Sequence, residues 1–431
     1  MKNTTLYIIL VLCCCGMLQA QNPVPASSKT QRILLWGATA HLGNGDVLEN
    51  SAIGMENGKI TFVMSAKGYK PAMASFDTLI ELTGKHIYPG FIAMNTQIGM
   101  NEIELVRSTI DSREAGSVNP SARAIIAYNT DSKVTPTVRS NGILMAQIAP
   151  VGGLVSGTSS VVELDAWNWE DAAYKMDEGV WMNWPSMRIY KAWWADPEEE
   201  QQVRNEKQMQ DLNLLFNEAR AYSLQPKPLV ENQHLEAMRG LFTGTKKLYV
   251  KCDFVREIIA AVQFCKEYGI QMVLCGGADS WRQTDLLKEN HIPVIIMRTH
   301  TLPSREDDDV DLPYKLPALL KKAGVEVAIT DEGFWQERNL PFEAGTSAGY
   351  GITKEEALTM ITLGPARILG IDKTVGSLED GKDATLFVSD GDALDMKTNH
   401  VTMAFIRGKQ INLDNIQTQL YHKYMKKYGF E

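Results

Sequence analysis

Cysteine is scarce in this chain, and basic charge is not in excess. Only six cysteines occur among 431 residues, and three of them lie in an apolar stretch at the N-terminus. The other three, Cys252, Cys265 and Cys275, are an odd and widely spaced set. This set argues against a disulfide framework and predicts buried thiols. The formal net charge is −9, so neither nucleic acid nor an anionic membrane is expected as the main partner.

The N-terminus carries the features of a secretory signal. Lys2 precedes an apolar stretch at 6–18, and Leu18-Gln19-Ala20 is typical of a cleavage site after Ala20. A membrane span needs roughly 20 apolar residues, and this stretch is shorter, so we expect export to the periplasm or medium without a span. Lipidation at one of Cys13, Cys14 and Cys15 is the less favoured alternative, because none follows the usual Gly, Ala or Ser.

The rest of the chain alternates between strand and helix patterns. Short strands are expected at 33–39, 51–54, 59–63 and 78–82, with more of the same kind at 376–388 and 402–409. Between them, helical patterns such as 254–268 and 353–363 separate apolar runs. The candidate strands among those runs are 143–148, 248–252, 271–274, 293–297 and 326–330. With no repeat or low-complexity tract, this alternation predicts an α/β protein with one (β/α)8 barrel.

One apolar run ends in two side-chain amides, Asn95 and Gln97, which alternation places on the same face of a strand. This stretch, 87–99, resembles the first barrel strand of the amidohydrolase superfamily, in the imidazolonepropionase-like branch. Residues 89–92 match the motif of the family, whereas Asn95 and Gln97 stand where two metal-binding histidines would be. The stretch 376–384 is similar to the Gly-Ser-Leu-Glu-x-Gly-Lys-Asp-Ala tag of the same family, and the resemblance covers nearly all of the chain.

The resemblance implies a domain organisation. Residues 33–85 and 371–411 would form a split β-sandwich, and 86–370 would form the barrel. The remaining segments would be a signal peptide at 1–20, a linker at 21–32 and a C-terminal helix at 412–431.

The resemblance also indicates which residues stand at the positions of the family's metal ligands. Lys251 occupies the place of a third ligand histidine and Gly276 that of a fourth, while Asp331 aligns with the aspartate that binds metal and carries protons. Zinc favours imidazole, thiolate and carboxylate ligands, so we expect no cofactor unless zinc binds in a non-standard way. Lys251 is expected to pair with Asp331 in place of the lost cation. The alternative is a desolvated Lys251 that acts as base or nucleophile.

Further candidate contacts follow the predicted strands, where the chemistry of a barrel is found. His300 follows the strand at 293–297, with an exposed loop histidine as the alternative, and Asp279 is either a ligand contact or a helix cap. Gly153 and Ser156 belong to a predicted loop, 152–160, that resembles a loop of the same branch. Tryptophan is concentrated after it, which is typical of ligand pockets and of interfaces alike; the residues are Trp167, Trp169, Trp181, Trp184, Trp193 and Trp194.

Two functions remain open at this point. By resemblance, the chain is a hydrolase of non-peptide C–N bonds in cyclic amide or peptide-like substrates, with the usual binuclear metal site lost. The alternative is a catalytically inactive barrel that binds a small molecule, forms a homo-oligomer or pairs with a competent relative. Fold alone does not decide between them.

Overall fold

An eight-stranded sheet that nearly closes on itself forms the centre of the computed structural model, which describes residues 24–27, 31–68 and 75–430. The predicted signal peptide lies outside the described residues. Neighbouring strands follow one another in sequence, and a parallel bridge from Thr96 to Gly333 brings the two edge strands together. The strands are β8 (Phe91–Thr96), β9 (Ile143–Ile148), β10 (Val155–Glu163), β11 (Ala173–Asn183), β12 (Lys247–Cys252), β13 (Met272–Gly276), β14 (Val294–Met297) and β15 (Val327–Thr330).

The predicted barrel class is confirmed, with one strand in an unexpected direction. β10 runs antiparallel to both β9 and β11, whereas the other neighbours pair in parallel. The expected loop at 152–160 is therefore wrong from Val155 onward. Its serines and glycine favour a loop by composition, but every residue of β10 is buried between neighbouring strands, where ladder hydrogen bonds satisfy the backbone.

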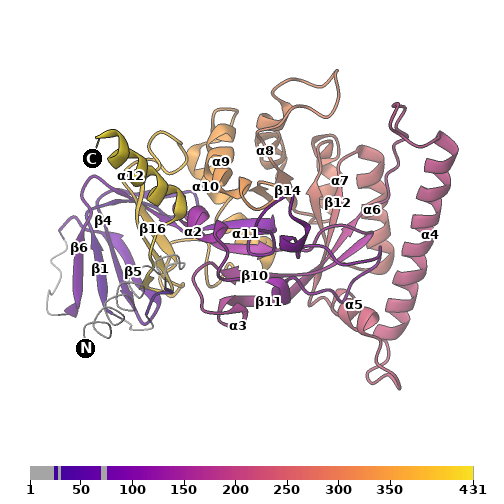
Figure 1. Ribbon diagram of the computed structural model, residues 1–431, viewed down its shortest axis with the longest axis horizontal. Coiled ribbons are helices and arrows are strands. Elements are labelled where there is room, and N and C mark those ends of the chain that lie inside the picture. Colours follow the sequence, from indigo (N-terminus) through magenta and orange to yellow (C-terminus); the bar gives the residue numbers. More distant parts are fainter. Residues whose placement is uncertain (1–23, 28–30, 69–74, 431) are drawn as a thin grey trace, which may run out of the picture.

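Helices cover the outside of the barrel, and Figure 1 shows the longest of them, α4 (Glu198–Ser223), at the end opposite the N-terminal strands. Local signals define several helix ends. The predicted capping box at the start of α10 (Lys354–Thr359) is present, since Thr353 and Glu356 bond each other's backbone N–H groups. In the described part of the chain, the other α-helices are α2 (Val134–Arg139), α3 (Trp169–Ala172), α5 (Gln233–Thr243), α6 (Val255–Tyr268), α7 (Thr284–Glu289), α8 (Leu312–Ala323), α9 (Leu340–Ala348), α11 (Leu363–Leu369) and α12 (Ile416–Tyr428).

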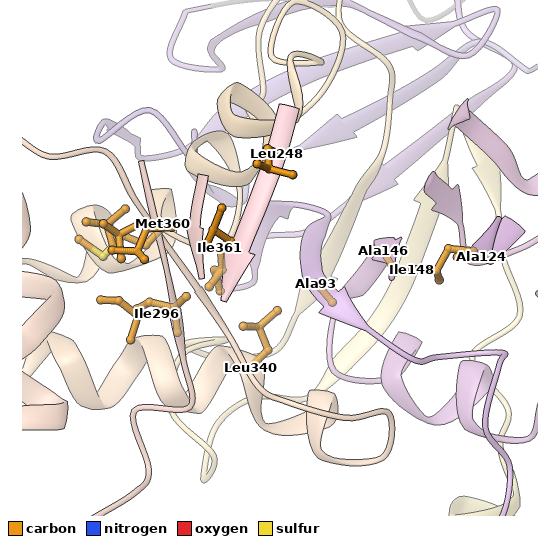
Figure 2. Close-up of a cluster of buried hydrophobic side chains, with 14 of the residues drawn as sticks. Ala93, Ala124, Ala146, Ile148, Leu248, Ile296, Leu340, Met360 and Ile361 are labelled. Carbon is orange, nitrogen blue, oxygen red and sulfur yellow. The ribbon is translucent and has the colours of Figure 1, made fainter. Parts of the chain in front are cut away.

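The main core lies between the outer faces of the strands and these helices. Figure 2 shows Ile148 and Ala146 of β9, Ile296 of β14 and Leu340 of α9 within this cluster. A second cluster fills the inside of the barrel with side chains such as Ile92, so the barrel is packed and not open. Cys252, Cys265 and Cys275 are buried free thiols, as predicted.

Strands from the N-terminal and C-terminal parts of the chain form a β-sandwich beside the barrel. One sheet contains β1 (Ile33–Trp36), β4 (Ser51–Glu56), β5 (Lys59–Ser65) and β6 (Thr78–Glu81). The other joins β2 (Thr39–His41), β3 (Val47–Leu48) and β7 (His86–Pro89) to β16 (Leu386–Ser389), β17 (Val401–Ile406) and β18 (Lys409–Gln410). β16 pairs with β7, which leads directly into β8 of the barrel. Within the described residues, no helix is long and apolar enough to cross a membrane.

Candidate functional site at the mouth of the barrel

The residues aligned with metal ligands do gather at one end of the barrel, although they are not ligands of the expected kind. Asn95 is buried and has a left-handed backbone with φ 51°. Its side-chain amide lies 3.6 Å from Met297 Sδ, and its backbone oxygen accepts a hydrogen bond from Gln97 Nε2 at 3.3 Å. The two carboxamides therefore keep most of their hydrogen-bonding capacity free at the barrel mouth.

Lys251 at the end of β12 pairs with Glu332 and not with Asp331. Its Nζ lies 2.5 Å from Glu332 Oε1, and the two side chains are 37% and 54% exposed. The predicted Lys251–Asp331 pair is wrong because Asp331 is buried, and an ammonium brought to it would lose its water. Glu332 lies at the rim, where both charges of the pair stay hydrated.

Asp331 follows β15 as a buried carboxyl group. Within the described part of the chain, no group makes a well-formed hydrogen bond to either carboxyl oxygen, and Arg298 Nε lies 3.9 Å from Oδ1. Burial, with a smaller contribution from the nearby Glu343, raises the pKa of Asp331 to about 6, whereas Arg298 opposes the shift. Asp331 is therefore a buried acid whose charge is poorly compensated.

Gly276 is the last of the positions aligned with metal ligands. Its backbone conformation disfavours the histidine that the resemblance places there. Its φ is 89°, and a Cβ atom would come within 2.5 Å of Asp253 Oδ1. Residues other than glycine rarely adopt a backbone conformation with such a positive φ. A histidine at this position would therefore need a change of backbone conformation as well as of side chain.

These residues do not fit a binuclear metal centre. Two neutral carboxamides, an ammonium and a glycine offer no imidazole, thiolate or carboxylate, and Lys251 would repel a cation. Among the described residues, no group of three or more His, Cys, Asp or Glu side chains is arranged to hold a metal ion.

Two cavities open at the barrel mouth on either side of the Lys251–Glu332 pair, and both residues line both cavities. The first cavity, of about 410 Å³, is lined by Asn95, Gln97, Arg113, Pro150, Val151, Gly152, Ser156, Trp181, Met182 and Asn183 in addition to the pair. The second cavity, of about 320 Å³, includes Asp253, Gly276, Met297, Arg298, Leu302 and Asp308 among its other lining residues. Both volumes are within the range of small-molecule sites.

Gly153 and Ser156 contribute to the first cavity through Asn183. Asn183 Nδ2 donates to the Gly153 carbonyl at 2.7 Å and to Ser156 Oγ at 3.3 Å. Gly153 has φ 67°, and a Cβ there would come within 2.7 Å of the Ser117 carbonyl, so only glycine fits this turn. Ser156 lines the cavity, whereas Gly153 holds the wall in place.

His300 and Asp279 make structural contacts instead of lining either cavity. His300 Nε2 lies 2.6 Å from Thr346 Oγ1, and its Nδ1 lies 3.4 Å from the buried Glu343, so the ring binds α9. Asp279 accepts a hydrogen bond from the Val255 N–H at the start of α6 and forms a bidentate pair with Arg305. These partners hold the loops around the second cavity in place.

A buried polar network inside the barrel could not be recognised from sequence spacing. Glu178 on β11 accepts hydrogen bonds from Gln147, Ser159 and Tyr249, at distances from 2.5 to 2.8 Å. Burial raises the pKa of Glu178, while its three donors favour the charged form. Gln147 Oε1 also accepts from the Asn95 N–H at 3.3 Å, which links this network to the barrel mouth.

Three polar residues that line the first cavity, Glu332, Arg113 and Asn183, were not predicted from the sequence. Glu332 directly follows Asp331, so its position after a barrel strand was the available signal. Arg113 lies in the long connection from β8 to β9, where only its place on the catalytic face would have pointed to it. Of the six clustered tryptophans, Trp181 and Trp184 are buried, and Trp181 alone lines this cavity.

Replacing Lys251 by Met is expected to change stability by no more than about 1 kcal/mol, because the ion pair with Glu332 is partly exposed and hydrated. Chemical denaturation of the wild type and Lys251→Met measures this difference. The double variant Lys251→Met/Glu332→Gln should match the single variant. A loss of several kcal/mol in the single variant alone would show instead that the pair is structurally essential.

Comparisons with known proteins agree with this architecture. Residues 317–411, from within α8 to just past β18, match the amidohydrolase family. An amidohydrolase from Thermotoga maritima MSB8 superimposes with a TM-score of 0.76 at 22% identity, covering 88% of this chain and 99% of that chain. The chain is amidohydrolase-like in fold. Four of the five positions that the resemblance aligns with metal ligands carry no usual ligand.

More distant amidohydrolase-like structures share the same architecture. A molinate hydrolase superimposes with a TM-score of 0.55 at 15% identity, over 89% of this chain and 95% of that chain. A Xaa-Pro dipeptidase with bound methionine in its active site gives 0.51 at 13% identity, over 88% and 100%. A comparison with curated proteins finds no match. At these identities the structures establish the fold alone.

Proposed function

We propose that this chain is an exported member of the amidohydrolase superfamily that binds a small amide or peptide-like ligand at the barrel mouth without the binuclear metal mechanism. The observation that carries the proposal is the Lys251–Glu332 pair. It occupies a position where the resemblance places a metal ligand, and a cavity of ligand size opens on each side of it. The leader-like sequence at 1–20 supports export.

Similar solved structures support the ligand class. They include a prolidase complexed with N-methylphosphonate-L-proline and an ochratoxinase from A. niger. Asn95 and Gln97 give a physical reason to expect an amide ligand. Each carboxamide offers both a donor and an acceptor, which complement the C=O and N–H of an amide.

Metal-free hydrolysis of a non-peptide C–N bond is the second candidate, and Asp331 favours it. Its pKa of about 6 leaves a mixed protonation state near neutral pH, which suits a group that takes up and releases protons. Asp331 does not line either cavity, however, so the ligand would have to reach it from the rim. Binding is therefore the function that the site supports best.

The two candidates are separated by one set of measurements on purified protein. Calorimetric titration with N-acetylated amino acids, in the presence of chelator, should detect binding, and chromatography of the same mixtures should detect no cleavage. Chelator-resistant cleavage that Asp331→Asn abolishes would establish the hydrolase. Binding that requires added metal would contradict the proposal.

A further inference from the structure

The first cavity contains one cation that has no partner. Arg113 makes no hydrogen bond or ion pair with any other described residue, whereas Lys251, the other cation in the wall, is neutralised by Glu332. Among the described residues that line this cavity, Glu332 is also the only acidic one. The cavity therefore has a surplus of one positive charge, at Arg113.

Backbone hydrogen bonds hold the segment that carries Arg113. The Val151 N–H donates to the Ser112 carbonyl at 2.8 Å, and the Leu154 N–H donates to the Ser117 carbonyl at 2.6 Å. These bonds tie the segment that carries Arg113 to residues 151–154, of which Val151 and Gly152 line the cavity. Gly152 leaves the room that the arginine needs, since a Cβ there would come within 2.7 Å of Arg113 Nε.

A second donor in the same wall also lacks an acceptor. Trp181 is 4% exposed and stacks on Tyr249 at a centroid distance of 4.7 Å, and no described group accepts a hydrogen bond from its Nε1–H. A buried N–H without an acceptor is costly and is rare in folded proteins. The Nε1 atom is itself buried, so this N–H does not reach the cavity, and Arg113 is the donor that is left for a ligand.

We infer that the first cavity binds an organic carboxylate that carries an amide group, with the carboxylate at Arg113 and the amide at Asn95 and Gln97. This inference rests on the proposed function. It adds that the ligand is negatively charged and that Arg113 binds the charged group. A guanidinium binds a carboxylate through two parallel hydrogen bonds. One unpaired cation balances a monoanion, whereas a phosphate dianion would leave a net negative charge in the cavity.

The test compares two probes that differ only in charge. N-acetyl-L-alanine and its neutral C-terminal amide are titrated calorimetrically into wild type and Arg113→Gln. The wild type should bind the carboxylate about tenfold more tightly or better, in line with a charge-assisted hydrogen bond. Arg113→Gln should remove that preference and leave the affinity for the neutral amide unchanged.

Two further variants complete the experiment. Arg220→Gln removes the same charge from the exposed end of α4 and should change neither affinity. Trp181→Phe keeps the aromatic ring but removes an N–H that is shielded from the cavity, so it should also leave both affinities unchanged. Equal melting temperatures of wild type and Arg113→Gln would show that the fold is intact, as expected for an exposed, unpaired side chain.

Each contrary outcome has a distinct meaning. Equal affinity for the two probes, or an unchanged preference in Arg113→Gln, overturns the carboxylate inference but leaves the proposed function standing. Inorganic phosphate that binds as tightly as the carboxylate overturns the assignment of a monoanion. A wild type that binds neither probe overturns both the inference and the proposed function.

Discussion

Asp331→Asn is expected to make the protein more stable at pH 8 by about 2–3 kcal/mol and to change its stability little at pH 4. Burial raises the pKa of Asp331 from 3.8 to about 6. Between these values the unfolded chain is ionised while the folded chain holds its proton, so stability is lost as pH rises through this window. Above pH 6 the full penalty applies, because each pH unit between the two pKa values costs about 1.4 kcal/mol of folding free energy.

Denaturant titrations of wild type and Asp331→Asn at pH 4, 6 and 8 measure this effect. Asp285→Asn provides a matched control, because it removes an exposed carboxylate from α7 and should shift stability by less than about 0.5 kcal/mol. If Asp331 held a resident metal ion, Asp331→Asn would instead lower stability at pH 8, and a chelator would reproduce the loss in the wild type.

Gly276→His is expected to destabilise the fold by about 3 kcal/mol or more. The histidine would have to adopt φ 89°, and its Cβ would lie 2.5 Å from Asp253 Oδ1. A left-handed conformation of this kind costs about 1–3 kcal/mol for a residue other than glycine, and relief of the clash adds to that cost. Thermal and chemical unfolding of the variant measure the sum.

Gly84→His separates the two contributions to this loss. Gly84 has a similar φ of 80° but open space around it, with no atom within 4 Å of a built Cβ. This control should therefore lose only the backbone part, about 1–3 kcal/mol, and less than Gly276→His loses. Equal losses at the two positions would show that crowding at Asp253 contributes nothing. A Gly276→His variant as stable as wild type would show that the backbone at β13 adapts freely to a ligand histidine.

Much of the fold could be predicted because its signals are local. The periodicity of 254–268 corresponds to α6, and the Thr353/Glu356 capping box depends on residues three positions apart. β10 could not be predicted in this way. Its serines and glycine are typical of a loop, and its extended form depends on the two strands between which it is buried.

The site was predictable in position but not in its contacts. The resemblance placed Asn95, Lys251 and Asp331 at strand ends, and all three lie at the mouth of the barrel. The partner of Lys251 depends on burial, since Asp331 is enclosed and Glu332 is at the rim, and neighbours in sequence do not reveal that difference. Arg113 depends on backbone bonds between segments about 40 residues apart, for which the sequence carries no local signal.

Zinc binding to the purified mature protein tests the central claim most directly, namely that this barrel mouth is a ligand site without a binuclear metal centre. The protein is incubated with excess zinc, dialysed without chelator and analysed for metal by mass spectrometry. The account predicts much less than one equivalent, because Asp331 is the only usual ligand among the five aligned positions. One or two equivalents retained by the wild type, and lost in Asp331→Asn, would contradict it.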